Sequence, residues 1–141
     1  MPKIVIVDDN QDLLNTYTVL LPAKGFAVLT APDGLSGLEL VAEHGSTIDC
    51  AVIDVRMPDL NGYQMVQALR GDPMTAHLPL IMLTAMTRAT DRQHGALVGV
   101  DFYLTKPVDP EDLMATIQAA TQVDPTQRLA RLRTLSEEGT A

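Results

Sequence analysis

Five short apolar runs recur along the chain, and longer segments with a different apolar spacing separate them. The first, third and fourth runs are almost continuously apolar rather than alternating, which is typical of strands covered on both faces. We therefore predict five β-strands, at residues 4–7, 26–29, 50–53, 80–83 and 102–104.

Between these runs, apolar residues fall at spacings of three and four, the pattern of one buried helix face. The pattern is weakest around residues 88–98, and Pro22 should end or kink the first helix near its last turn. The last helix has a clear start, because Asp109 can cap it and Pro110 suits its first position. The predicted helical faces are Leu13, Leu14, Tyr17, Leu20 and Leu21; Leu38, Val41 and Ala42; Met65, Val66 and Leu69; and Leu113, Met114 and Ile117.

Strands that alternate with helices predict βαβ units and an α/β fold. Right-handed crossovers then place helices on both faces of a parallel, doubly wound, five-stranded sheet. We expect this domain to cover residues 1–123. Residues 124–141 form a tail that we expect to be either an extra helix packed on the domain or the start of a linker.

The composition, 46% hydrophobic and 20% charged, is that of an ordinary globular protein. The net charge of −8 argues against direct nucleic-acid binding through a broad basic face. No apolar run approaches the roughly 20 residues that a membrane-spanning helix needs. The single cysteine, Cys50, lies in an apolar run and is expected to be a buried, unreactive side chain. These features fit a cytoplasmic protein with no membrane segment.

Candidate chemistry gathers where the predicted strands end. In an open parallel sheet, ligands bind outside the carboxyl ends of the strands. Asp8 and Asp9 follow the first strand, Asp54 the third, Thr84 ends the fourth, and Lys106 follows the fifth. Taken singly, the acids and the threonine could cap helices, and the lysine could be a solvated surface residue. Their convergence on one edge favours a site.

Three close carboxylates repel each other unless a cation is present. Mg²⁺ takes one or two carboxylates and leaves room for a phosphate oxygen, and a lysine suits the remaining phosphoryl oxygens. A carboxylate can also act as a nucleophile and form an aspartyl phosphate. The chain has no GxxxxGK[ST] or GxGxxG loop, so nucleotide binding is not indicated.

Four blocks make the chain resemble the receiver domain of bacterial two-component response regulators, the CheY-like family, over residues 2–122. They are IVIVDD at residues 4–9, DVRMPDLNG at 54–62, LTA at 83–85 and GVDFYLTKP at 99–107. The spacings also agree: 45 residues from Asp9 to Asp54, 30 on to Thr84 and 22 on to Lys106. The resemblance implies a flavodoxin-like sheet with strand order 2-1-3-4-5.

By this resemblance, Asp54 is the phosphoacceptor and takes its phosphoryl group from a phosphohistidine on a histidine kinase or phosphotransfer protein. The cofactor is Mg²⁺, held by Asp54 itself, by Asp9 directly and by Asp8 largely through water. The backbone carbonyl of Arg56 completes the set. Lys106 binds the phosphoryl group, and its peptide bond to the following proline is expected to be cis.

The resemblance also implies a switch formed by Thr84 and Tyr103. The Thr84 hydroxyl would turn to the phosphoryl group, and Tyr103 would move inward and bias a two-state equilibrium. The face made by the fourth helix, fifth strand and fifth helix would then change its partner binding. A plainer interpretation of Tyr103 is an edge-strand aromatic packed at the surface.

Two positions that tune phosphoryl lifetime in this family carry Arg56 and Met86, and we expect a comparatively long-lived aspartyl phosphate. In the loop after Asp54, Pro58 and Gly62 are expected to shape a tight turn rather than to take part in chemistry. The histidines fall away from the strand-end edge and are expected to be ordinary surface residues: His44, His77 and His94.

The predicted function is a phosphorylation-dependent signalling switch, as in a phosphorelay. It would catalyse its own phosphorylation and dephosphorylation but turn over no external substrate, so we do not class it as an enzyme. Its partners would be the phosphodonor protein and either a downstream protein target or a missing output domain. A homodimer through the switch face is also compatible with the sequence.

Three alternatives stay open at this point. The chain could be a receiver-like interaction module that never sees phosphate, although such modules usually lose one of the five site residues. It could be the N-terminal receiver of a larger response regulator or hybrid kinase. It could also be a Mg²⁺-dependent phosphatase, but those enzymes usually carry a second acid where this chain has Arg56.

Overall fold

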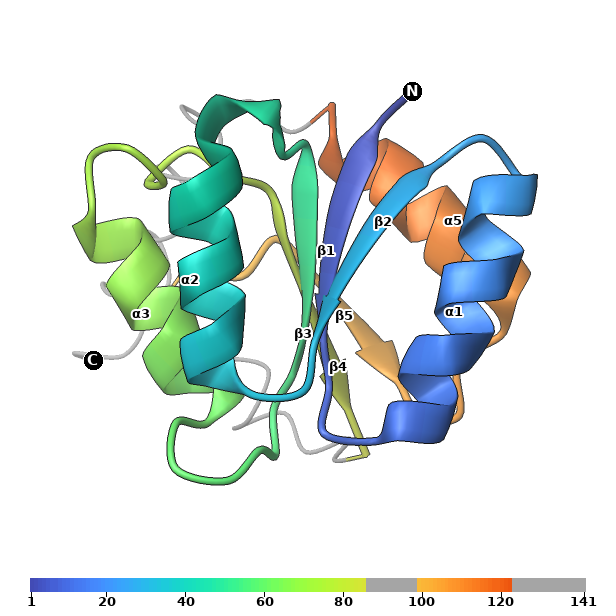
Figure 1. Ribbon diagram of the computed structural model, residues 1–141, viewed down its shortest axis with the longest axis horizontal. Helices are drawn as coiled ribbons and strands as arrows, with labels where there is room; N and C mark the ends of the chain where they lie inside the picture. Colours follow the sequence, from blue (N-terminus) through green and yellow to red (C-terminus); the bar gives the residue numbers. More distant parts are fainter. Residues whose placement is uncertain (86–98, 123–141) are drawn as a thin grey trace, which may run out of the picture.

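The computed structural model describes residues 1–85 and 99–122 (Figure 1). The chain alternates strands and helices, and the sheet is parallel with the order β2-β1-β3-β4-β5. The strands are β1 (Lys3–Val7), β2 (Ala27–Ala31), β3 (Cys50–Asp54), β4 (Leu80–Thr84) and β5 (Phe102–Thr105). The helices are α1 (Gln11–Ala23), α2 (Gly34–His44), α3 (Gly62–Gly71) and α5 (Pro110–Ala120), with a short 3-10 turn at Gly45–Thr47. The predicted α/β fold and strand order are confirmed.

Two parts of the sequence prediction lie outside the described residues. The first is the predicted helix around residues 88–98, which contains His94, together with Met86 just before it. The second is the tail from residue 124 onward. The domain boundary at 123 therefore stays a prediction. One predicted strand is displaced along the chain: the run at 26–29 becomes β2 at Ala27–Ala31, while Phe26 is buried just before it.

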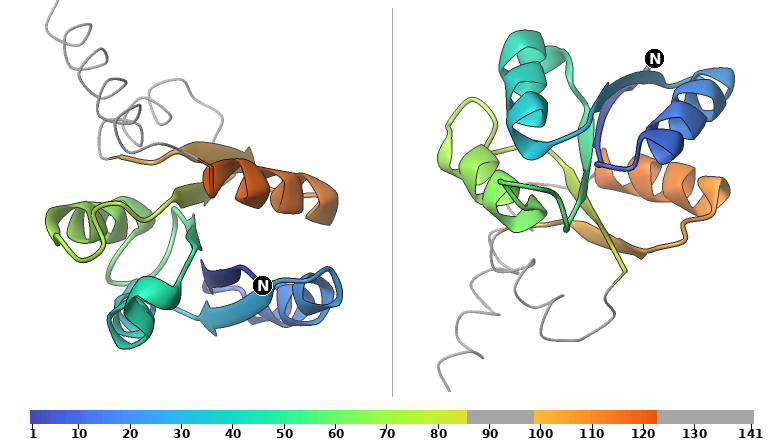
Figure 2. Two further views of the ribbon diagram at one scale, coloured as in Figure 1. Left: turned by 90° about the horizontal axis from the view of Figure 1, so that it is seen from above. Right: turned by 60° about the horizontal axis from the view of Figure 1, so that its bottom comes forward.

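Helices cover both faces of the sheet, as Figures 1 and 2 show, with α2 and α3 on one face and α1 and α5 on the other. Alternate side chains of β1 enter the two layers: Val5 and Val7 pack toward α2 and α3, and Ile4 and Ile6 toward α1 and α5. The central strands β3 and β4 are buried along their whole length. The continuous apolar runs thus reflect strands covered on both faces, as predicted.

Local signals fix the helix ends. The Asp109 side chain accepts a hydrogen bond from the Glu111 backbone N–H at 2.9 Å, and Pro110 opens α5. At the start of α1 the cap is Asn10, whose side chain accepts from Leu13 N–H at 3.2 Å. The two acids before Asn10 are therefore not used as helix caps. Helix α1 continues through Pro22 and ends one residue later.

A close approach between α2 and β1 gives the first testable prediction. A Cβ at Gly37 would lie 2.7 Å from Cγ2 of Val7 and 2.9 Å from Cε of Met65. We expect Gly37→Ala to lower the free energy of unfolding by about 1–3 kcal/mol, the usual cost of overpacking a tight core. Urea denaturation followed by circular dichroism measures the change.

The matched control is Gly71→Ala at the end of α3, where a Cβ would meet nothing within 4 Å. This variant should keep or raise the free energy of unfolding, by up to about 1 kcal/mol, because alanine favours the helix. Equal stability of the two variants would contradict the packing of α2 on β1.

Candidate functional site

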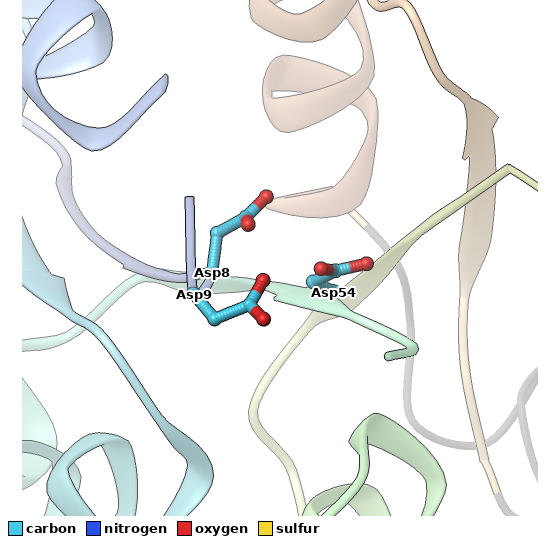
Figure 3. A group of neighbouring side chains, drawn as sticks. All are labelled: Asp8, Asp9 and Asp54. Carbon is cyan, nitrogen blue, oxygen red and sulfur yellow. The ribbon is translucent and has the colours of Figure 1, made fainter. Parts of the chain in front are cut away.

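The carboxyl ends of β1 and β3 bring three aspartates together. One carboxylate oxygen each from Asp8, Asp9 and Asp54 lies within 4.8 Å of the other two. Figure 3 shows the three side chains at the ends of these neighbouring strands. Asp8 is fully buried and Asp54 is 5% exposed, whereas Asp9 faces solvent. The cluster is thus buried on the side of Asp8 and Asp54 and open to solvent on the side of Asp9.

Lys106 enters the cluster from the edge strand. Its ammonium Nζ lies 2.8 Å from Oδ2 of Asp8 and 3.2 Å from Oδ2 of Asp54. The Lys106 backbone N–H donates to the Thr84 carbonyl at 2.8 Å, and its peptide bond to Pro107 is cis, as the family resemblance implies. One ammonium therefore sits between two of the three carboxylates.

Strand pleating explains why these groups meet. Along β3, Cys50 and Val52 point toward the α1 and α5 layer, so Asp54 falls on that side as well. The same alternation along β5, from Phe102 and Leu104, places Lys106 there too. The alternation of side chains along β3 and β5 thus places Asp54 and Lys106 on the same face, at the carboxyl end of the sheet.

Burial dominates the electrostatics of Asp54. Desolvation raises the pKa of its carboxyl, and the neighbouring Asp8 carboxylate raises it further. The Lys106 ammonium and the Arg56 backbone N–H, which donates to Oδ1 at 3.4 Å, only partly oppose this. For Lys106, burial lowers the pKa, but the bonds and charges of the two aspartates outweigh it, so its pKa is raised.

The donor set fits a hard divalent cation. Three carboxylates face one ammonium, so two negative charges are left when all the acids are ionised. Both Asp8 oxygens already have partners, Lys106 Nζ and the Asn10 backbone N–H, the latter at 2.9 Å. Within residues 1–85 and 99–122, no hydrogen bond or ion pair is made by the Asp9 carboxylate. Asp9 therefore offers the open carboxylate oxygens that Mg²⁺ prefers, and in the same part of the chain the Asp54 oxygens have only the longer contacts to Lys106 and to the Arg56 N–H, at 3.2 and 3.4 Å.

The loop after Asp54 borders a cavity of about 510 Å³ beside Asp9. It adjoins the side of the cluster on which Asp9 faces solvent. The cavity is lined by Asp9, Val55, Arg56, Met57, Pro58, Asn61 and Tyr63.

Gly62 has a role in this loop that differs from the predicted tight turn. A Cβ at Gly62 would collide with the backbone oxygen of Asp54, so only glycine lets α3 start directly against the end of β3. The left-handed residue of the loop is Asp59, with φ of 67°. The missing side chain, rather than a special backbone angle, is what the loop requires at Gly62.

The predicted switch residues lie on the other side of the sheet. Thr84 ends β4 and is 2% exposed, and Tyr103 is half-buried against the layer of α2 and α3. Because Met82 pairs with Tyr103 and Thr84 with Thr105, pleating puts the two switch residues on the same face of neighbouring strands. Their roles in switching stay predictions.

The remaining sequence predictions concern residues away from this edge. Cys50 is fully buried, and burial raises the pKa of its thiol, so it is an unreactive core residue. His44 ends α2, and His77 is exposed in the connection that leads into β4, at the opposite edge of the sheet.

Comparison with known proteins gives a consistent picture. A sequence model described as the response regulator receiver domain matches residues 4–118. Protein PilH of Pseudomonas aeruginosa is 38% identical over 119 residues, which cover 84% of this chain and 97% of PilH. Transcriptional regulatory protein CpxR of Escherichia coli K12 is 40% identical over 119 residues, which cover 84% of this chain and 49% of CpxR. The chain thus spans about half the length of several curated relatives that it matches.

Solved structures agree with the fold. Chemotaxis protein CheY4 of Vibrio cholerae superposes with a TM-score of 0.80 at 32% identity, over 85% of this chain and 98% of that protein. In the part of the chain that the structure describes, no helix has the length and apolar character needed to cross a membrane.

The raised pKa of Asp54 gives a stability prediction. A raised carboxyl pKa means that folding favours the protonated form, so stability falls as the pH rises through the folded-state pKa. At pH 7 without divalent cations, we expect Asp54→Asn to melt about 2–4 °C higher, the shift that about 1 kcal/mol produces at this chain length. The gain should shrink at acidic pH, where the wild-type carboxyl is protonated. Differential scanning calorimetry across pH measures both effects.

Glu39→Gln, which removes an exposed acid from the middle of α2, is the matched control and should leave the melting temperature nearly unchanged. An equal rise in both variants would show that net charge, not the buried cluster, is responsible.

Proposed function

This chain belongs to the response regulator receiver domain family of two-component systems, and from that premise we propose that it is a phosphorylation-dependent signalling switch. The phosphoryl group would come from a phosphohistidine of a histidine kinase or phosphotransfer protein. Asp54 would receive it. The observation that carries the proposal is the Asp54 carboxylate itself, paired with Lys106 beside two further carboxylates and next to an open cavity.

In the transfer step, a carboxylate oxygen of Asp54 attacks the phosphorus of the donor. The O–P bond forms as the P–N bond to the donor histidine breaks, and the imidazole leaves with its electron pair. Lys106 exchanges its carboxylate partners for the oxygens of the incoming group, where its charge offsets the negative charge of the phosphoryl group. Hydrolysis of the acyl phosphate by water later releases inorganic phosphate and restores the carboxylate.

Asp9 and Asp54, with Asp8 largely through water and the backbone carbonyl of Arg56, would hold Mg²⁺. The ion would neutralise the acids and the phosphoryl oxygens, which is the main requirement of phosphoryl transfer. The two negative charges in excess over Lys106 support this assignment. The protein turns over no external substrate in this proposal, because the phosphoryl group passes only through its own aspartate.

Output depends on the switch pair. Thr84 would turn toward the phosphoryl group, and Tyr103 would follow and change the surface formed by β5 and α5 together with the predicted fourth helix. We propose that this surface binds a cytoplasmic protein partner. Relatives such as CpxR, of which this chain spans about half the length, make an attached output domain the alternative.

The direct test is intact-mass spectrometry after incubation with acetyl phosphate, with Mg²⁺ or with a chelator. We expect one added phosphoryl group that requires both Mg²⁺ and Asp54, and none on Asp54→Asn. Asp59→Asn is the matched control, because it removes an exposed acid five residues along the same loop and should still be phosphorylated. Absence of the adduct on the wild type, together with no binding of beryllofluoride, would favour the phosphate-independent interaction module.

The switch has its own test. Thr84→Ala should accept the phosphoryl group but fail to pass the signal on, because it lacks the hydroxyl that contacts the phosphoryl group. Nuclear magnetic resonance of the amides of β5 and α5 would show shifts on phosphorylation in the wild type and in Thr84→Ser, and much smaller shifts in Thr84→Ala. Full shifts in Thr84→Ala would remove the threonine from the switch.

A further inference from the structure

A buried ion pair lies at the amino ends of β4 and β5, whereas the aspartates cluster at the carboxyl ends of the strands. Arg70, in the last turn of α3, places Nη2 3.2 Å from Oδ2 of Asp101, the residue just before β5. The Asp101 side chain is fully buried and that of Arg70 is 13% exposed. Because a charge buried at this depth is costly unless it is well paired, the contact constrains both segments strongly.

The guanidinium group of Arg70 also collects backbone carbonyls. Nε and Nη2 donate to the Gly99 carbonyl at 3.0 and 2.8 Å, and Nη1 donates to the carbonyls of Ala76 and Leu78. Gly99 has φ of +105°, and a Cβ there would lie 2.8 Å from Nε. One side chain thus joins the end of α3 to the segments that lead into β4 and β5.

Asp101 uses the same carboxylate to set the first rung between β4 and β5. Its Oδ2 accepts the Leu80 backbone N–H at 2.9 Å, while its own N–H donates to the Leu80 carbonyl at 2.9 Å. The ladder continues from there to the hydrogen bond between Lys106 N–H and the Thr84 carbonyl. The pairing that begins at Asp101 therefore ends at Lys106.

Strand β5 needs such an anchor. It is a four-residue edge strand whose one neighbour in the described sheet is β4, and most of its side chains are only partly buried. A shift of pairing by one residue would turn every side chain to the opposite face. Lys106 would then leave the aspartates, and Tyr103 would leave the face that it shares with Thr84.

We propose that Arg70 and Asp101 are positioning residues for phosphoryl transfer. Their ion pair sets the register of β5 and thereby holds the Lys106 ammonium against Asp8 and Asp54 from the far end of the strand. The proposal rests on the proposed function, since it assigns these residues to the same site. Of the three strands that carry the charged groups of the site, β1, β3 and β5, it assigns the placement of β5 to this pair.

The strand topology separates this role from general loss of stability. The carboxylates that would hold the metal follow or end β1 and β3, whereas the hydrogen bonds of Arg70 and Asp101 described above join α3 to the segments that lead into β4 and β5. Lys106 comes from β5. Loss of the anchor should therefore impair the step that uses Lys106 and leave Mg²⁺ binding intact.

The test uses Asp101→Asn in the full chain, with Mg²⁺ affinity from calorimetry and the rate of phosphorylation by acetyl phosphate at saturating Mg²⁺. We expect the rate to fall about tenfold, because displacements of about 1 Å at a distance can cost up to a hundredfold. Mg²⁺ affinity should stay unchanged. Arg70→Lys keeps the charge but loses the planar guanidinium group. It should show the same split between a lower phosphorylation rate and an unchanged Mg²⁺ affinity.

A double-mutant cycle identifies the route of the effect. In a Lys106→Ala background, Asp101→Asn should slow phosphorylation no further, because the residue through which it acts is already gone. Leu69→Ala, which removes a buried apolar side chain beside Arg70, is the control for destabilisation and should not show the split. A parallel loss of Mg²⁺ affinity and rate in Asp101→Asn, or an undiminished effect without Lys106, would overturn the proposal.

Hydrogen exchange keeps the two proposals distinguishable. If the wild type takes up no phosphoryl group, the proposed function fails, but the anchor can still be judged from the Lys106 amide, which donates to Thr84. Asp101→Asn should make this amide exchange faster than it does in Leu69→Ala at matched stability. Equal exchange in the two variants would overturn the anchoring role.

Discussion

The site depends on one ammonium group placed between two buried carboxylates. Lys106 reaches from the edge strand past β4 to Asp54 on β3 and Asp8 on β1, and it offsets part of the charge that burial makes costly. The pairing is incomplete, because Asp9 adds a third carboxylate. The excess negative charge makes the site receptive to a divalent cation, and burial, together with the neighbouring Asp8 carboxylate, raises the pKa of Asp54.

The remainder of the fold keeps the three carboxylates close together. The apolar side chains of β1, β3 and β4 are buried in two layers, which fixes the strand ends where the aspartates stand. Glycines bring the helices close to these strands: Gly37 lies against Val7, and Gly62 against the backbone of Asp54. A rigid frame of this kind lets like charges stay together, since the carboxylates cannot move apart without disrupting the packed core.

The sequence predicted what depends on local signals and on strand direction. Apolar runs identified the strands, Asp109 and Pro110 marked the start of α5, and the shared carboxyl edge of parallel strands brought Asp8, Asp9 and Asp54 together. Contacts set by register across distant segments could not be predicted. Arg70 is the only basic residue in the last turn of α3, which on sequence alone suits a solvated surface side chain, and Asp101 stands 31 residues away. The close approach at Gly62 likewise depends on how α3 packs against β3.

The ion pairs at the two ends of β5 differ in a way that suits a switch. Arg70 has several carbonyl partners besides the fully buried carboxylate of Asp101, so any exchange of partners there would strand a buried charge. Lys106 is more exposed, and its two carboxylate partners can be replaced by other anionic oxygens where a divalent cation offsets the charge of the buried aspartates. A strand fixed at its start and exchangeable at its end can change the position of Tyr103 without losing its register. A ligand at the aspartates could then bias the conformation of this edge of the sheet while the core stays unchanged.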